Sequence, residues 1–184
     1  VRARPADQKI VVVAIDNATV RRFGSSYYSR KYNAELLDRL FESGANRVYF
    51  DEAFSQPMDP EGDDAFAAAL ARHKGKVFLG GNSFLRRAAD GSLALRPLEK
   101  FRQNAQIRSF RSERSPFSLT IEAYFNDLSG QERVPTISAD IAKHSGPPEE
   151  TYRPDWSIQV DTIPTVGLTG VLDRTVDPSG FNDK

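Results

Sequence analysis

The feature that most constrains the fold is an apolar run, Ile10–Ile15, that ends directly on Asp16. A second strand-like stretch, Arg47–Phe50, ends in the same way on Asp51-Glu52 about one β-α unit later. A run that is apolar at every position is typical of a strand buried on both faces of a parallel sheet. We therefore expect these carboxylates at the carboxyl ends of neighbouring parallel strands, where open α/β sheets form their ligand crevice.

The first half of the chain predicts a β-α-β-α-β unit. Strands are expected over 9–15, 46–50 and 76–79, the last closed by Gly80-Gly81-Asn82. Right-handed crossovers favour a parallel core, with the first strand beside the second or between the second and third. The two helices between these strands are each expected to bury one face, and their predicted ends are an Asn33 cap and Gly44 for the first, and a start near Asp63-Asp64 and Gly75 for the second. The side chains on these faces are Ala34, Leu37, Leu40 and Phe41 in the first helix, and Phe66, Ala69, Leu70 and His73 in the second.

The second half is an irregular region that contains further strands. The fold class is therefore α/β, a three-layer-like parallel or mixed sheet built on the N-terminal β-α-β-α-β unit. The predicted elements are a hairpin at Asp90-Gly91 between 84–85 and 93–95, strands over 106–110, 117–125 and 157–161, and short helices over 135–144 and 165–172.

Composition excludes several classes of protein. The formal net charge is zero, so no electrostatic feature indicates nucleic acid or an anionic membrane as a partner. Cysteine is absent, which excludes thiol catalysis, disulfides and cysteine-bound zinc. No apolar stretch approaches the roughly 20 residues that span a bilayer, and no signal peptide is visible. The abrupt ends suggest that the chain is an excised piece of a longer protein.

Several segments resemble the CHASE2 family of extracellular sensory domains. The resemblance covers residues from about 9 to 82 well and from about 134 to 181 loosely. It rests on Ile10–Asp16, Ala34–Leu40, Phe50–Ser55 and Asp63–Leu70, with Tyr152-Arg153 and Ile163–Val166 in the second half.

The resemblance implies a single extracytoplasmic sensory domain over 1–184, held at the periplasmic or extracellular face of the inner membrane by flanking transmembrane helices. It also implies a cytoplasmic nucleotide cyclase, histidine kinase or serine/threonine kinase as output. Three departures are evident. Ser26–Arg30 has no tryptophan or proline, Gln106–Ser109 does not match the family's middle strand, and the family's last strand would begin at Lys184. We therefore expect that strand to be truncated.

The predicted ligand crevice combines residues from the strand ends with an aromatic loop. Arg30 is expected to neutralise the acidic rim through Asp16, Asp51, Asp63 or Asp64. Each residue also has a structural alternative: the aspartates cap loops or helices, and the tyrosines pack over a helix start. The candidate ligand-binding residues are Asp16, Tyr27, Tyr28, Arg30, Asp51, Glu52, Gly80, Gly81 and Asn82.

Two further groups of residues favour structural roles. His73 and His144 fall at predicted helix C-termini and lack a ligand-spaced partner, so no metal site is expected through them. Arg108, Arg111 and Arg114 alternate along one segment and are expected to form a solvated face.

We expect binding rather than catalysis, with no cofactor and no metal, because no catalytic motif is present. The expected partner is an unknown small molecule or a periplasmic protein, with a homodimer as a further candidate. Two alternatives stay open. One is a metal-dependent hydrolase that uses Asp16 and Asp51, and the other is a docking module that binds a protein through 84–133.

Overall fold

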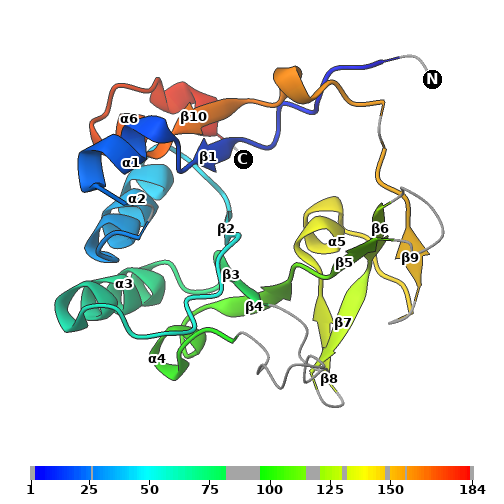
Figure 1. Cartoon of the computed structure of the whole chain (residues 1–184), viewed down its shortest axis with the longest axis horizontal. Coiled ribbons are helices and arrows are strands. Elements are labelled where there is room, and N and C mark those ends of the chain that lie inside the picture. The colour runs from blue at the N-terminus through cyan, green and yellow to red at the C-terminus, as the bar shows by residue number, and fades with distance from the viewer. Residues whose placement is uncertain are drawn as a thin grey trace. The chain divides into compact units, whose positions relative to one another are not determined.

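The computed structural model describes residues 3–25, 27–81, 96–114, 121–129, 132–147, 150–155 and 157–182 (Figure 1). The chain divides into two compact units, and each is described by itself. The predicted α/β class is confirmed, with helices, parallel strands and a β-α-β-α-β arrangement at the N-terminus. The first unit consists of Val1–Val48, Met58–Lys76 and Trp156–Lys184, and the second of Tyr49–Pro57 and Val77–Asp155.

Helices α2 (Lys31–Glu42) and α3 (Pro60–Arg72) pack against each other and form the core of the first unit. The apolar faces predicted for both helices are confirmed. Leu37, Phe66 and Leu70 are completely buried, because apolar side chains three and four residues apart lie on one face of a helix.

Both helices begin earlier than predicted. Asn33 is not the cap of α2: the helix starts at Lys31, and Asn33 lies buried in its first turns. Helix α3 starts at Pro60, where the Asp59 carboxylate accepts a hydrogen bond from the Gly62 amide. The side chain of Asp59 supplies the cap and the ring of Pro60 fits the first helical position, so no later start is required.

The predicted helix ends are confirmed by backbone geometry. Gly44, two residues after α2, has φ +92°, and Gly75, after the cap residue of α3, has φ +84°. Glycine adopts this left-handed conformation without the steric penalty that a Cβ atom imposes.

Strand β1 (Val12–Ala14) pairs in parallel with β10 (Thr165–Gly167). The predicted strand order is therefore wrong, since the described strands place β2 in a different sheet, next to β3. The prediction that this strand is buried on both faces is also wrong. Ile10, Val12 and Ile15 expose 42–47% of their surface, because a sheet of two three-residue strands is too narrow to be covered fully.

The C-terminal part of the first unit differs from two predictions. Residues 165–172 form a strand and then a helix, because β-branched Thr165 and Val166 favour the extended conformation. The strand predicted over 157–161 is reduced to a bridge between Ile158 and Arg4. The remaining elements of this unit are α1 (Asn17–Phe23), η1 (Val160–Thr162), α6 (Leu168–Leu172) and η2 (Pro178–Phe181).

The second unit contains a sheet with the order β2-β3-β4, in which β3 and β4 pair in parallel. All five residues of β3 are buried. Its central position explains the burial, since β3 has a hydrogen-bonded neighbour on each side. The strands are β2 (Val48–Phe50), β3 (Val77–Gly81) and β4 (Gln106–Ser109).

The rest of the second unit is antiparallel, with the strand orders β5-β6-β9 and β7-β8. The helix predicted over 135–144 is confirmed as α5, with Thr136 as its cap. The hairpin predicted at Asp90-Gly91 lies outside the described residues. The elements are α4 (Glu99–Arg102), β5 (Ser112–Arg114), β6 (Ile121–Tyr124), β7 (Asn126–Ser129), β8 (Glu132–Pro135), α5 (Ile137–Ala142) and β9 (Thr151–Tyr152).

Within the described part of the chain, no helix combines the length and the apolar character that crossing a membrane requires.

Candidate functional site

Asp16, which ends the first strand, is the cap of a helix. Its carboxylate accepts hydrogen bonds from the backbone amide of Thr19 at 2.9 Å and from the Thr19 hydroxyl at 3.0 Å. The backbone amide bond from Thr19 is the main cause that holds the pKa of Asp16 below its usual value. The capping interpretation is confirmed, and α1, which the sequence did not predict, follows from it.

The other oxygen of the Asp16 carboxylate constrains strand β10. A Cβ atom at Gly167 would lie 2.6 Å from Asp16 Oδ2, so a larger residue at position 167 would force that carboxylate to move. Glycine at the end of β10 therefore allows the two parallel strands to end side by side on a carboxylate and a helix start.

Arg30 forms the ion pair expected of it. Its guanidinium Nη1 lies 2.6 Å from Asp63 Oδ1, and both side chains are only 4% exposed. The second Asp63 oxygen accepts the backbone amide of Met58 at 3.2 Å. Of the four acids predicted to pair with Arg30, Asp63 is thus the one that forms the ion pair. The pair connects the start of α2 to the first turn of α3.

The tyrosines of the following loop have different surroundings. Tyr28 stacks on Phe23 with 5.0 Å between ring centres, and Tyr32 also contacts Phe23, at 4.5 Å. The prediction that aromatic residues pack at the helix start is confirmed for these two side chains. Tyr27, in contrast, exposes 79% of its surface.

The residues predicted on the second and third strands all belong to the second unit. Asp51 is exposed directly after β2, and Glu52 is half-buried. Gly80 and Gly81 are not the turn that was predicted: both are buried within β3 and pair with β4. Asn82 lies outside the described residues.

Packing explains the glycine at position 80. A Cβ atom there would overlap the ring of Phe110 and would lie 2.9 Å from the carbonyl oxygen of Phe50. The missing side chain makes room for this ring rather than for a ligand. The prediction that the nine crevice residues bind a ligand together stays a prediction.

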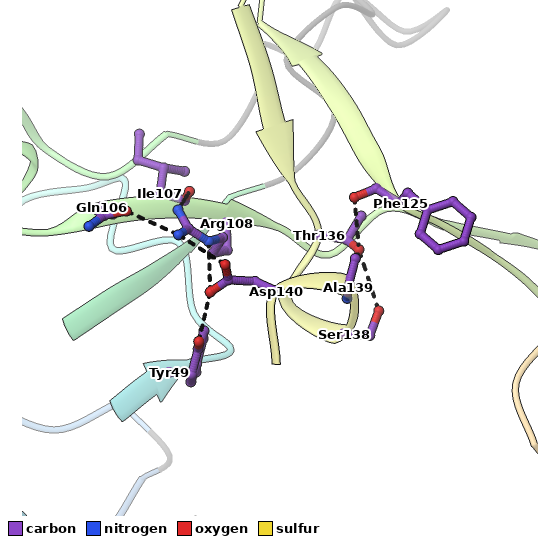
Figure 2. A network of polar contacts seen from close by, with 9 residues as sticks. All are labelled: Tyr49, Gln106, Ile107, Arg108, Phe125, Thr136, Ser138, Ala139 and Asp140. Atoms are coloured by element: carbon purple, nitrogen blue, oxygen red, sulfur yellow. Dashed lines mark hydrogen bonds and ion pairs between the residues drawn. The ribbon is translucent and has the colours of Figure 1, made fainter. Parts of the chain in front are cut away.

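Figure 2 shows a polar network that joins the sheet of the second unit to α5. Asp140 of α5 accepts a hydrogen bond from the Tyr49 hydroxyl at 2.7 Å and one from Arg108 Nη2 at 3.2 Å. Arg108 Nε lies 3.1 Å from Asp140 Oδ2, the oxygen that accepts the Tyr49 hydroxyl, and this is an ion-pair contact rather than a hydrogen bond. The Arg108 and Asp140 side chains are 11% and 19% exposed, so the pair is largely shielded from solvent.

The same residues form a row across three strands. Tyr49 of β2 stacks on Phe78 of β3 with 4.5 Å between ring centres, and the Arg108 guanidinium of β4 lies 4.6 Å from the Phe78 ring centre. Arg108 also donates to the Ile107 carbonyl at 2.9 Å (Figure 2). Asp140 therefore links the two outer strands of the sheet across the aromatic residue between them.

A buried carboxylate lies on β7. Asp127 accepts a hydrogen bond from the Ser109 hydroxyl at 2.9 Å, and Arg111 Nη1 lies 3.9 Å from its other oxygen. The Arg111 guanidinium is centred 3.8 Å from the ring of Tyr124, a cation–π contact. Asp127 and Ser109 are almost completely buried.

These contacts overturn the prediction of a solvated arginine face. Arg108 and Arg111 are 11% and 17% exposed, and each lies against a carboxylate and an aromatic ring. The side chain of Arg114 lies outside the described residues. The partners Asp127 and Asp140 are 16 and 32 residues away from these arginines, so no local spacing in the sequence indicated the pairs.

The histidines occupy helix ends, as predicted. His73 ends α3, lies 2.8 Å from Asp38 Oδ1 and stacks on Phe41. Burial raises the pKa of Asp38, but hydrogen bonds from Arg72 and His73 outweigh burial, and the pKa is lowered. His144 follows α5 and is exposed.

The chemistry that these arrangements support is positioning and binding. Among the described residues, no group of three or more histidine, aspartate or glutamate side chains could hold a metal ion. Among the described residues of the second unit, the shielded carboxylates of Asp127 and Asp140 each lie beside an arginine.

Comparison with known families gives one result. The model of the CHASE2 domain matches residues 1–184, the whole chain. No curated protein and no solved structure matches the chain.

Proposed function

Because the chain belongs to the CHASE2 family, whose members are extracellular sensory domains of membrane signalling receptors, we propose that it senses a small molecule or a periplasmic protein. It would transmit this signal through flanking transmembrane helices to a cytoplasmic nucleotide cyclase, histidine kinase or serine/threonine kinase. The family match over the whole chain is the observation that carries the proposal. The domain would lie on the outer side of the bacterial inner membrane.

Within the second unit, Asp51 is the residue that we propose contacts the signal. It is exposed and directly follows β2, at the carboxyl end of a strand beside β3. The half-buried Glu52 follows it, so a cationic or polyhydroxylated molecule suits this position better than a phosphate does.

The contacts of β2 suggest how a signal would leave this position. Tyr49, two residues before Asp51, donates its hydroxyl hydrogen to Asp140 of α5, which also binds Arg108 of β4. A ligand that prefers one position of the end of β2 would act on α5 and β4 through this network. Only such a difference in affinity between two conformations can drive a signal.

Binding at Asp51 is tested in the full-length receptor. After native mass spectrometry of the purified domain identifies co-purified molecules, the receptor is assayed with Asp51→Ala and with Asp64→Ala, which removes an exposed carboxylate of α3. We expect Asp51→Ala to abolish the response to the molecule and Asp64→Ala to preserve it. A folded Asp51→Ala receptor that responds normally would show that the site lies elsewhere.

The two alternatives receive less support. Asp16, proposed as a metal ligand of a hydrolase, caps α1. The docking alternative concerns residues 84–133, and within this segment Arg108 and Arg111 lie against Asp140 and Asp127. Substituting these arginines would weaken the fold as well as any docking, so they are unsuitable probes of a partner protein.

A further inference from the structure

The segment from Asn17 to Ala34 concentrates positive charge. It contains four basic residues and no acidic residue, although the whole chain has equal numbers of both. Arg30 is buried against Asp63, and Arg22 lies 2.7 Å from Asp173. Arg21 and Lys31 are both exposed, and they supply the positive charge of this surface.

The same segment exposes apolar and aromatic surface. Tyr27 is 79% exposed and Val20 is 39% exposed. In the same segment, Phe23, Tyr28 and Tyr32 form an aromatic cluster with ring centres 4.5–6.4 Å apart. We call the four exposed residues Val20, Arg21, Tyr27 and Lys31 the α1–α2 surface.

We propose that the α1–α2 surface binds the anionic lipid headgroups of the membrane in which the receptor is anchored. Tyrosine is favoured at membrane interfaces, because its ring is apolar and its hydroxyl accepts water or headgroup contacts. Arginine and lysine near an anionic bilayer are attracted to its surface charge. The charge of the surface is positive and the charge of the headgroups is negative, so the surface favours binding of lipid.

The aromatic cluster also contacts two basic side chains. The Arg22 guanidinium lies 5.4 Å from the ring centre of Phe23, and Lys31 Nζ lies 5.2 Å from that of Tyr32. The second of these cation–π contacts holds Lys31, one of the four residues of the α1–α2 surface, beside the cluster. In the proposed complex, the exposed ring of Tyr27 enters the interfacial layer of the bilayer.

This interaction is weak in free solution and strong in the receptor. Two basic side chains contribute about fivefold each to binding of an anionic surface. A domain tethered to the same membrane meets the headgroups at an effective concentration of millimolar order, so this modest affinity holds it at the bilayer. The position of the first unit relative to the membrane would then depend on lipid charge.

Vesicle binding tests the proposal directly. The 1–184 protein is sedimented with vesicles of phosphatidylcholine alone or of phosphatidylcholine with phosphatidylglycerol, up to millimolar lipid. We expect binding only to the anionic vesicles. Arg21→Ala/Lys31→Ala should weaken it about 25-fold, the product of two fivefold losses. The control Lys9→Ala/Lys74→Ala removes two exposed charges elsewhere in the same unit and should change binding less than about twofold.

A second measurement locates the contact. The chain has no cysteine, so Tyr27→Cys and Val160→Cys each carry a single environment-sensitive fluorophore. The two native side chains are 79% and 78% exposed, which makes the positions matched. The label at 27 should shift to the blue on anionic vesicles, and the label at 160 should not.

Three results would overturn the proposal: no binding at millimolar lipid, equal losses in the two double variants, or equal shifts of the two labels. A receptor whose signalling fails with Arg21→Ala/Lys31→Ala while vesicle binding is unchanged would also overturn it, and would assign the surface to a partner protein.

Discussion

Removing the Asp140 carboxylate should destabilise the protein more than removing one member of an exposed ion pair does. Asp140→Ala leaves the Arg108 guanidinium without its carboxylate and the Tyr49 hydroxyl without its acceptor. The affected contacts connect β2, β4 and α5, so the loss falls on the part of the chain that joins the sheet to the helix (Figure 2).

The magnitude follows from burial. Removing one partner of a fully buried ion pair costs about 3–5 kcal/mol. The side chains here are 11% and 19% exposed, so water screens part of that cost. The unsatisfied Tyr49 hydroxyl adds about 1 kcal/mol. We therefore expect Asp140→Ala to lower the free energy of unfolding by about 2–4 kcal/mol.

Urea unfolding followed by far-UV circular dichroism measures this difference, with hydrogen exchange to show which unit unfolds. Asp140→Asn keeps an acceptor for Tyr49 and should lose less than Asp140→Ala. Tyr49→Phe alone should cost about 1 kcal/mol, and almost nothing once Asp140 is alanine. The surface control is Glu42→Ala, whose partner Arg174 is 68% exposed; it should cost less than about 0.5 kcal/mol. An Asp140→Ala protein as stable as Glu42→Ala would refute the reasoning.

Three further outcomes are expected. Arg30→Met should lower the free energy of unfolding in urea by about 3–5 kcal/mol, because it leaves the buried Asp63 carboxylate without its counter-ion. Adding Asp63→Leu should recover part of this loss. A double variant less stable than the single one would contradict this account. Asp16→Ala should lower the melting temperature and Asp16→Asn should largely preserve it, since asparagine also caps helices. Hydrogen bonds from Thr19 hold the folded pKa of Asp16 below its usual value, so its stabilisation is present above about pH 4 and is lost as the pH falls through the folded pKa. Asp16→Asn should lack this acid dependence in melts between pH 2 and pH 7. Gly80→Ala should cost about 1–3 kcal/mol, because the new methyl group would meet the ring of Phe110 and a backbone carbonyl, and an unchanged urea midpoint would disprove that packing.

Features set by neighbouring residues were predicted well from the sequence. The buried faces of α2 and α3 follow from side chains three and four residues apart, and their ends follow from glycines at positive φ. The Asp16 cap needs only an amide three residues later. The Arg30–Asp63 pair is an exception, because its members are 33 residues apart. It was predicted because the acids expected at the strand ends required a counter-ion.

Features set by distant residues were not predictable in this way. Strand β1 pairs with β10, about 150 residues away, and nothing in the apolar run Ile10–Ile15 specifies that partner. Gly80-Gly81 had the composition of a turn. The ring that fills the space above Gly80 belongs to Phe110, which follows β4 and lies 30 residues further along the chain. A pair of glycines alone does not distinguish a turn from a tightly covered strand.

The arginines of the second unit show why charge along the sequence is a poor guide to exposure. Arg108 and Ser109 are neighbours on β4 and point to opposite faces, yet each reaches a carboxylate, the half-buried Asp140 and the buried Asp127. Side chains on both faces of β4 therefore make polar contacts within the protein. The alternating arginines of this segment had predicted a solvated surface instead. A sensory domain must hold one arrangement until its signal changes the balance between two, and these paired contacts provide a defined arrangement to change. The exposed Asp51 and the half-buried Asp140 are joined through Tyr49, which lies two residues before Asp51 and donates a hydrogen bond to Asp140. The position proposed for the signal therefore adjoins the network that would respond to it.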